Sequence, residues 1–316
     1  MATLRPSSLS LGALVLALML AGCGGGGGDG SATATNVPST LPQEPGAPVL
    51  TGNTATDGRA WINYRRSQLG LSVLSRNVNI DAAAQNHSDY QRLNNTIAHD
   101  EIQGKSGFTG VTLVQRLGAA GYALVLPHVT GEVISANGNS SGFVQAEELI
   151  TAIYHRFVIF EPMFREIGTG AATTSSAYTY FTADFATSGG FGPGLGATRL
   201  VGYPVNNQAR VPTNFLSDNE SPDPVPNQNE VGYPISVHAD IESKLTVTAF
   251  TVRPRNTGLA LTVRLLSRAS DPAMQSDSAA AIVPLTVLSG NTVYDVAFSG
   301  TVDQVPVTLN WSFTTK

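Results

Sequence analysis

The hydrophobic pattern of this chain changes its period near residue 190. Before that point, apolar residues recur at the three- and four-residue spacing of helices, as over residues 80–91, between short strand-like runs. After it, apolar and polar residues alternate, most clearly over residues 305–313, which is the period of a strand with one buried face. The two periods predict an α+β body over residues 58–187 and an all-β sandwich over residues 198–316, each folding separately.

The individual elements follow from the same patterns. Thr112 and Gln115 form a possible capping box for the third helix, and Gly121 is placed to end it. Residues 188–197, rich in glycine, are expected to be a linker between the two bodies. Helices are predicted at 61–69, 80–91, 112–121 and 147–157, and strands at 132–136, 167–172, 178–185, 259–265, 294–298 and 305–313.

Residues 1–22 have the composition of a secretory signal peptide. One early basic residue, Arg5, precedes an apolar run over residues 9–21. That run is short for a bilayer-spanning helix, which needs about 20 apolar residues. We therefore expect this segment to be an export signal.

The signal segment ends in Leu-Ala-Gly, and Cys23 follows directly after it. This resembles the bacterial lipobox, which implies that Cys23 is lipidated, with palmitate-type acyl chains, and becomes the mature N-terminus. Acyl chains of that kind would anchor the protein firmly in a membrane. Gly24 stands where an Asp would resemble an inner-membrane retention signal. The predicted location is the cell envelope, at the outer rather than the inner membrane.

Residues 23–57 are predicted to be a tether. Of these 35 residues, 20 are Gly, Pro, Ser or Thr, and none is aromatic. Such a composition cannot bury enough apolar surface to fold by itself.

Charge and cysteine content exclude several classes of protein. The formal net charge is −5, which excludes a nucleic-acid partner, because that would need a basic surface. Cys23 is the one cysteine, so neither a disulfide framework nor a cysteine-based zinc site is available.

Two motifs match catalytic patterns only formally. Ser140 is the central residue of a G-x-S-x-G sequence, but the predicted body is too small for the sheet of an α/β-hydrolase. Residues 104–106 read Gly-Lys-Ser without the first glycine of a phosphate-binding loop.

His87 lies on the apolar stripe of its helix and is expected to be a core histidine.

Seven short motifs, in order, give the first body a specific resemblance. They resemble the CAP superfamily, which covers cysteine-rich secretory proteins, antigen 5 and pathogenesis-related proteins, in its bacterial SCP-like branch. The resemblance implies a three-layer α-β-α sandwich. The motifs lie at residues 63–74, 83–88, 98–100, 131–134, 154–156, 164–170 and 182–185.

The resemblance also implies a polar cavity. His99, Glu132 and His155 match the cavity motifs, and Asp100 or Glu101 is a weaker candidate for a second acid. Two imidazoles and a carboxylate with an open position could hold Zn²⁺ or another divalent metal. The alternative is a hydrogen-bonded polar cluster that shapes a groove without a metal.

Three functions remain open at this point. The first is an envelope-anchored binding module for a lipid, glycan, peptide or divalent metal. The second is a metal-dependent hydrolase of envelope peptides or peptidoglycan, with Glu132 as a possible base. The third is an adhesion protein that acts through the second body, which resembles bacterial Ig-like modules at residues 283–296 and 311–315.

Overall fold

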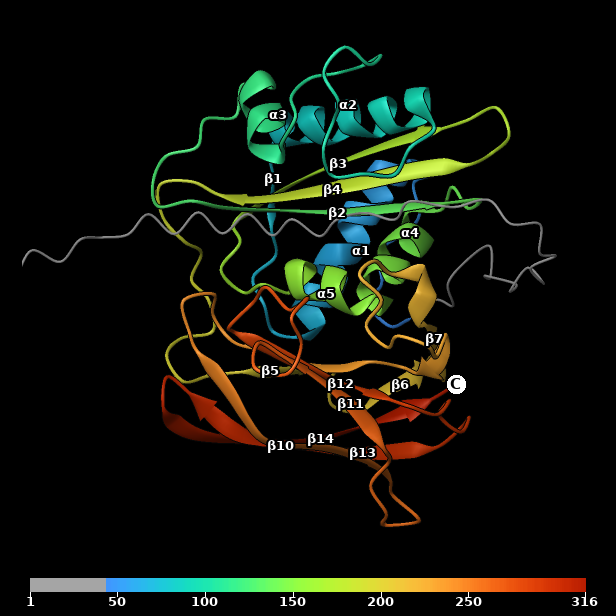
Figure 1. Cartoon of the computed structure of the whole chain (residues 1–316), viewed down its shortest axis with the longest axis vertical. Helices are drawn as coiled ribbons and strands as arrows, with labels where there is room; N and C mark the ends of the chain where they lie inside the picture. Colours follow the sequence, from blue (N-terminus) through green and yellow to red (C-terminus); the bar gives the residue numbers. More distant parts are fainter. Residues whose placement is uncertain (1–43) are drawn as a thin grey trace, which may run out of the picture.

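The computed structural model describes residues 44–316; the predicted signal peptide, Cys23 and the first part of the predicted tether lie outside the described residues. The elements stack in layers along the longest axis (Figure 1). Two helices cover one face of a first sheet, three helices cover its other face, and the C-terminal β-sheets follow beneath them. No helix of the described part combines the length and apolar character needed to cross a bilayer.

The first sheet has the strand order β1-β3-β4-β2. Its central strand β4 pairs antiparallel with both β2 and β3, and every residue of β4 is buried because helices cover both faces. The three strands expected in this body are confirmed. The strands are β1 (Ser75–Arg76), β2 (Val129–Asn137), β3 (Glu166–Thr173) and β4 (Thr179–Thr187).

Five helices surround this sheet. The helices α2 and α3 lie on one face, and α1, α4 and α5 lie on the other (Figure 1). Two glycines of β3 let α2 approach closely: a Cβ at Gly168 would lie 2.1 Å from the Asp81 nitrogen, and one at Gly170 would lie 2.2 Å from the Gln85 nitrogen. The helices are α1 (Thr54–Gln68), α2 (Val78–Asn94), α3 (Leu113–Ala119), α4 (Gly142–Thr151) and α5 (Ile153–Ile159).

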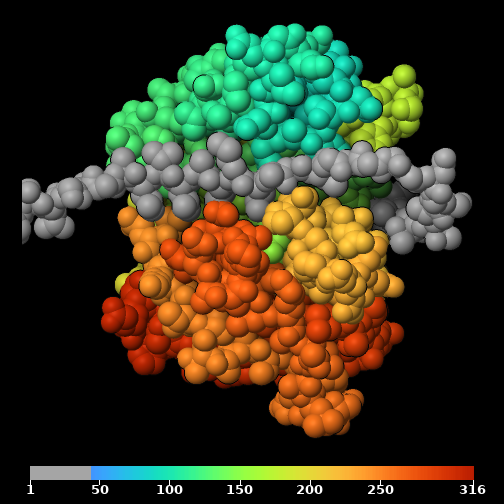
Figure 2. All heavy atoms as spheres, viewed as in Figure 1, coloured from blue at the N-terminus to red at the C-terminus, as the bar shows by residue number. Residues whose placement is uncertain are grey.

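Three predicted elements are wrong in their bounds. The helix expected over 61–69 begins seven residues earlier, at Thr54. The helix expected over 147–157 is two helices, because Ala152 has extended backbone angles (φ −68°, ψ 120°) between α4 and α5. The strand expected over 259–265 begins only at Val263, and Leu259 is 76% exposed in the loop before it. Alternation alone could not separate a strand from a loop that projects into solvent (Figure 2).

The C-terminal region consists of β-sheets. One sheet has the order β10-β13-β14-β6, a second has the order β11-β12-β9-β5, and β7 pairs with β8. The alternation predicted over 305–313 lies within β14. The strands are β5 (Val201–Tyr203), β6 (Gln208–Val211), β7 (Asn214–Leu216), β8 (Glu230–Gly232), β9 (Ile235–His238), β10 (Leu245–Pro254), β11 (Val263–Ser267), β12 (Ala279–Pro284), β13 (Val293–Val302) and β14 (Val305–Thr315).

One hydrophobic cluster extends through both bodies. The stretch 188–197 is part of this packing rather than a free linker: Phe191 and Leu195 pack against the cluster, and the Gly192 N–H donates to the Met163 carbonyl at 2.8 Å. Figure 2 shows the two bodies in contact over their visible junction. The cluster includes Ile62, Ile150 and Phe160 from the first body and Tyr203, Ile235 and Phe298 from the β region.

The expected boundary between tether and folded body is also corrected. Helix α1 begins at Thr54, four residues before the predicted start of the body. Upstream of it, the Glu44 carboxylate accepts hydrogen bonds from the Arg65 guanidinium at 2.7 and 2.8 Å. The Thr51 backbone and hydroxyl both donate to Asp57. Residues 44–53 are therefore held against the folded part.

Candidate functional site

Glu132 points toward the layer of α2 and α3. The residues before it and after it in β2 lie on the opposite face, since a Cβ at Gly131 would be 2.7 Å from Val158 of α5 and successive side chains of a strand point to opposite faces. Glu132 is 3% exposed. It is paired in register with Asp184 of β4.

Arg116 of α3 brings a positive charge to this carboxylate. Its Nη2 donates to Glu132 Oε2 at 2.5 Å, and its Nη1 donates to the His99 carbonyl at 2.7 Å. Its Nε lies 4.0 Å from Glu101 Oε1. Burial would raise the pKa of Glu132, but the charges of Arg116 and His87 and the hydrogen bond from His99 hold it well below its ordinary value. Glu132 is therefore ionised and paired inside the protein.

His99 is the member of this cluster that reaches the surface. Its Nδ1 lies 2.8 Å from Glu132 Oε1, and its side chain is 13% exposed. Within the described residues its Nε2 makes no hydrogen bond. The carboxylate orients the ring and leaves the second nitrogen available to a ligand.

Glu101 and His87 form the inner part of the cluster. His87 Nδ1 lies 2.9 Å from Glu101 Oε1, and His87 Nε2 lies 2.8 Å from the Ala98 carbonyl oxygen. His87 is fully buried, as expected of a core histidine. Burial would raise the pKa of Glu101, but hydrogen bonds from His87 and from the Thr109 backbone N–H lower it.

Asp100 and Glu101, the two candidates for a second acid in the cavity, differ in burial. Glu101 is 1% exposed within the cluster, whereas Asp100 is exposed to solvent. Glu101 is therefore the acid that accompanies Glu132 in this structure.

Asp184 is a buried acid that sequence reasoning did not identify as a site residue. Neither of its carboxyl oxygens has a hydrogen-bond partner among the described residues. Burial and the neighbouring charge of Glu132 raise its pKa well above the ordinary value. Its motif was read only as a strand, although alternation along that strand could have placed it beside Glu132.

Arg116 was missed as well, although the sequence holds a signal for it. It follows Leu113 by three residues and precedes Leu117, so it lies toward the apolar side of the predicted helix. An arginine in that position must find a buried partner.

The predicted meeting of His155 with His99 and Glu132 is wrong. His155 lies on α5, which packs on the sheet face opposite to that of Glu132. Its Nδ1 lies 2.9 Å from Glu220 Oε1, in the C-terminal region. The same Glu220 accepts the backbone N–H groups of Ile153, Tyr154 and His155 at 2.7, 2.7 and 3.1 Å. His155 thus belongs to the junction of the two bodies.

The residues around Glu132 do not fit a divalent metal. Among residues 44–316, no group of three or more His, Cys, Asp or Glu side chains is arranged to hold one. Instead the Arg116 guanidinium already supplies the positive charge between Glu132 and Glu101, and Asp184, with its raised pKa, adds no further anionic ligand. Metal ligands must be deprotonated and free to coordinate.

Ser140 has no catalytic surroundings. It lies in an exposed loop beside a hollow of about 410 Å³ whose lining includes Asp57 and Asn139 but no histidine. The Ser140 carbonyl accepts a hydrogen bond from the Thr54 hydroxyl at 2.7 Å. Its role in this structure is to position the loop against α1.

Comparisons with known proteins agree with the motif pattern in the first body. The model of the cysteine-rich secretory protein family, CAP, matches residues 60–185. A search of curated proteins gives no match.

Two solved structures are similar to part of the chain. One is an extracellular protein containing a SCP domain from Bacillus anthracis, with 23% identity, a TM-score of 0.36, and coverage of 42% of this chain and 39% of that protein. The other is an outer surface protein from Borrelia burgdorferi, with 18% identity, a TM-score of 0.35, and coverage of 41% of this chain and 89% of that protein. The match therefore spans about two fifths of the Bacillus protein. Residues 60–185 of this chain form a CAP domain, followed by a C-terminal region of β-sheets.

Proposed function

We propose that the chain is a cell-envelope lipoprotein whose CAP domain is a metal-free binding module, with His99 as the contact residue. The observation that carries this proposal is the internal pairing of Glu132 with Arg116 at 2.5 Å. A carboxylate neutralised in this way orients His99 but is not available to a cation. His99 Nε2 remains as a directional group for recognition.

The envelope location rests on the sequence around Cys23, which resembles a lipobox. The proposed lipid anchor and tether would hold the CAP domain near a membrane surface. The C-terminal region, which resembles Ig-like modules in sequence, would act as a rigid spacer or second binding surface. Replacing Cys23 with Ser and fractionating the cells tests the anchor, because an unchanged membrane fraction would contradict it.

The proposed ligand is an envelope component: a lipid, a glycan or a peptide. Sedimentation of the protein with purified peptidoglycan and with phospholipid vesicles separates these sources. We expect His99→Ala to lose binding to one of them by about tenfold or more, the loss expected when a hydrogen bond to a ligand is removed. His128→Ala is the matched control, because His128 is also half-buried in the CAP domain and lies outside the cluster. Equal binding by wild type and His99→Ala would contradict the proposal.

Calorimetric titration with zinc tests the proposal that the CAP domain binds its ligand without a metal. We expect wild type and His99→Ala to give the same heat. Stoichiometric zinc binding that is lost in His99→Ala would overturn it.

A second candidate function is hydrolysis, and the His99–Glu132 pair favours it. A histidine whose Nδ1 is held by a carboxylate at 2.8 Å has the arrangement of a general base with its orienting group. Glu132 itself is a poor base, because its lowered pKa leaves it with little affinity for a proton. Release of fragments from peptidoglycan by wild type, but not by His99→Ala, would support this function over simple binding.

A further inference from the structure

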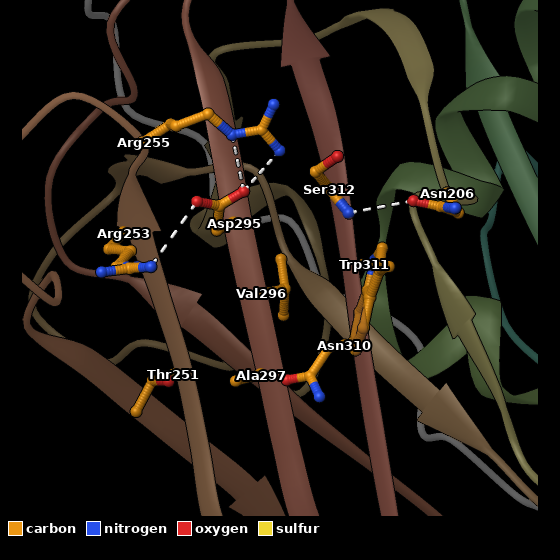
Figure 3. Close-up of a pocket in the computed structure, with 10 residues that line it drawn as sticks. All are labelled: Asn206, Thr251, Arg253, Arg255, Asp295, Val296, Ala297, Asn310, Trp311 and Ser312. Carbon is orange, nitrogen blue, oxygen red and sulfur yellow. Dashed lines mark hydrogen bonds and ion pairs between the residues drawn. The ribbon is translucent and has the colours of Figure 1, made fainter. Parts of the chain in front are cut away.

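The outer sheet of the C-terminal region carries a hollow of about 370 Å³ (Figure 3). Two cross-strand rows surround it: Arg253, Asp295 and Ser312 are neighbours on β10, β13 and β14, and so are Thr251, Ala297 and Asn310. Ala297 has the shortest side chain of these six and lies between Thr251 and Asn310, so the surface is low at that point. Volumes of about 300–1,000 Å³ are typical of small-molecule sites.

The charge of this hollow is positive on balance. Arg255 donates twice to Asp295 Oδ1, at 2.9 and 2.6 Å. Arg253 approaches the other oxygen of Asp295 only to 3.8 Å, and its side chain is 51% exposed. Two guanidinium groups thus face one carboxylate. The Arg253 guanidinium makes no hydrogen bond within the described residues, which leaves its planar set of N–H donors available.

Uncommitted polar groups line the rest of the hollow. The side chains of Thr251, Asn310 and Ser312 make no hydrogen bonds with other described residues. Asn206, in the turn before β6, accepts from the Ser312 backbone N–H at 3.2 Å through its oxygen and keeps its NH₂ group free. Two amides and two hydroxyls therefore surround the same space as Arg253.

Trp311 lies beneath the hollow, on the inner face of the sheet. Successive side chains of β14 point to opposite faces, so the Trp311 ring packs in the core, against Gly202 of β5, where a Cβ would come within 2.9 Å of the ring. The groups that face the hollow are therefore polar, which suits a ligand rich in hydroxyl groups.

We propose that this hollow binds a small acidic saccharide, with its carboxylate on Arg253 and its hydroxyl groups on Asn206, Asn310 and Ser312. A guanidinium group matches the two oxygens of a carboxylate. The sheet lies on the side of the molecule away from α2 and α3 (Figure 1), so the site is separate from His99 and independent of the function proposed for the CAP domain.

The test uses the chain from residue 24 onward with glucuronic acid and N-acetylmuramic acid as probes, glucose as the neutral sugar and acetate as the carboxylate without a ring. Ligand-observed NMR reports binding. We expect at least one acidic sugar to bind with a dissociation constant on the order of 1 mM, glucose to bind more weakly, and acetate to give no signal.

Variants connect the binding to this site. Arg253→Gln and Asn310→Ala should each weaken acidic-sugar binding by about tenfold. Arg268→Gln is the matched control, because Arg268 is 53% exposed and also pairs loosely with an acid, Asp277, at 3.7 Å. The proposal is overturned if neither acidic sugar binds at about ten times that concentration, if acetate binds as well as the sugars, or if Arg253→Gln binds like wild type.

Discussion

Arg116 holds together a cluster of buried ionisable side chains. Its guanidinium contacts Glu132 directly, lies 4.0 Å from Glu101 and accounts for the low pKa of the Glu132 carboxyl against the opposing effect of burial. Removing one partner of a buried ion pair leaves an uncompensated charge, which is far more costly than removing an exposed one. The cluster depends on Arg116 more than on any motif residue.

The corresponding prediction concerns Arg116→Met. We expect a loss of about 3–5 kcal/mol in the free energy of unfolding, since Glu132 and Glu101 would be left with too little positive charge. Arg92→Ala is the control, because Arg92 pairs with Asp89 at the surface and such pairs are worth about 0–1 kcal/mol. Urea unfolding followed by circular dichroism measures both. Equal losses in the two variants would show that the cluster is not held by Arg116.

Replacing Asp184 is expected to raise the free energy of unfolding, whereas replacing Arg116 is expected to lower it. Its pKa in the folded state is raised by burial and by Glu132, so between the unfolded and folded pKa values the folded state holds one more proton. Asp184 therefore costs stability as pH rises, by about 1.4 kcal/mol for each pH unit in that window. We expect Asp184→Asn to gain stability relative to wild type as the pH rises above about 4, the ordinary pKa of an aspartate. Asp100→Asn, at an exposed position, should show no such gain.

Only part of this site could be predicted from the sequence. His99 and Glu132 were identified through motifs, and the structure brings them together at 2.8 Å. His155 was assigned to the same cluster through resemblance alone, and its place on α5 puts the sheet between them. Motif order along the chain does not specify which face of a sheet a side chain occupies.

At the scale of elements, the start of α5 depends on a residue far along the chain. Ala152 occupies the N-cap position without a side chain that can accept a hydrogen bond. Glu220 supplies that function from the C-terminal region by accepting three backbone N–H groups of the first turn. Helical periodicity could not reveal the break at Ala152, because alanine favours helix and the capping group is 68 residues away.

The capping of α5 by Glu220 predicts that variants at positions 220 and 152 are coupled. Glu220→Ala should lower the free energy of unfolding by about 1–3 kcal/mol, because buried N–H groups lose their acceptor. Adding Ala152→Ser should restore about 1 kcal/mol by supplying a local cap, whereas the same change in wild type should have little effect. Urea unfolding of the four proteins gives the coupling. Equal effects of Ala152→Ser in both backgrounds would contradict the capping role of Glu220.

At the scale of the whole molecule, Arg156 ties the CAP domain to the β region. Its Nη1 donates to the Pro234 carbonyl at 2.7 Å, and its Cζ lies 4.9 and 5.0 Å from the ring centres of Tyr203 and Tyr233. These tyrosines occupy equivalent positions in the two Val-Gly-Tyr-Pro sequences, which thus flank one cation from two sides. The role of the two Val-Gly-Tyr-Pro sequences could not be inferred from the sequence, because only the fold brings both tyrosines to Arg156.

The shared core and this junction predict that the two bodies do not unfold independently, in contrast to the expectation from the change of period. Residues 44–190 alone would expose Arg156, the uncapped start of α5 and the apolar side chains that now contact the β region. We expect that fragment to bind a hydrophobic dye and to lack a cooperative transition, whereas residues 44–316 should unfold in one calorimetric transition with equal van't Hoff and calorimetric enthalpies. Two separate transitions in the longer protein, or a cooperatively folded 44–190 fragment, would instead show that the two bodies fold independently.

The Arg156→Met variant of the longer protein distinguishes these cases further, because it weakens the junction without removing either body. If the core is truly shared, it should lower the single transition as a whole rather than split it.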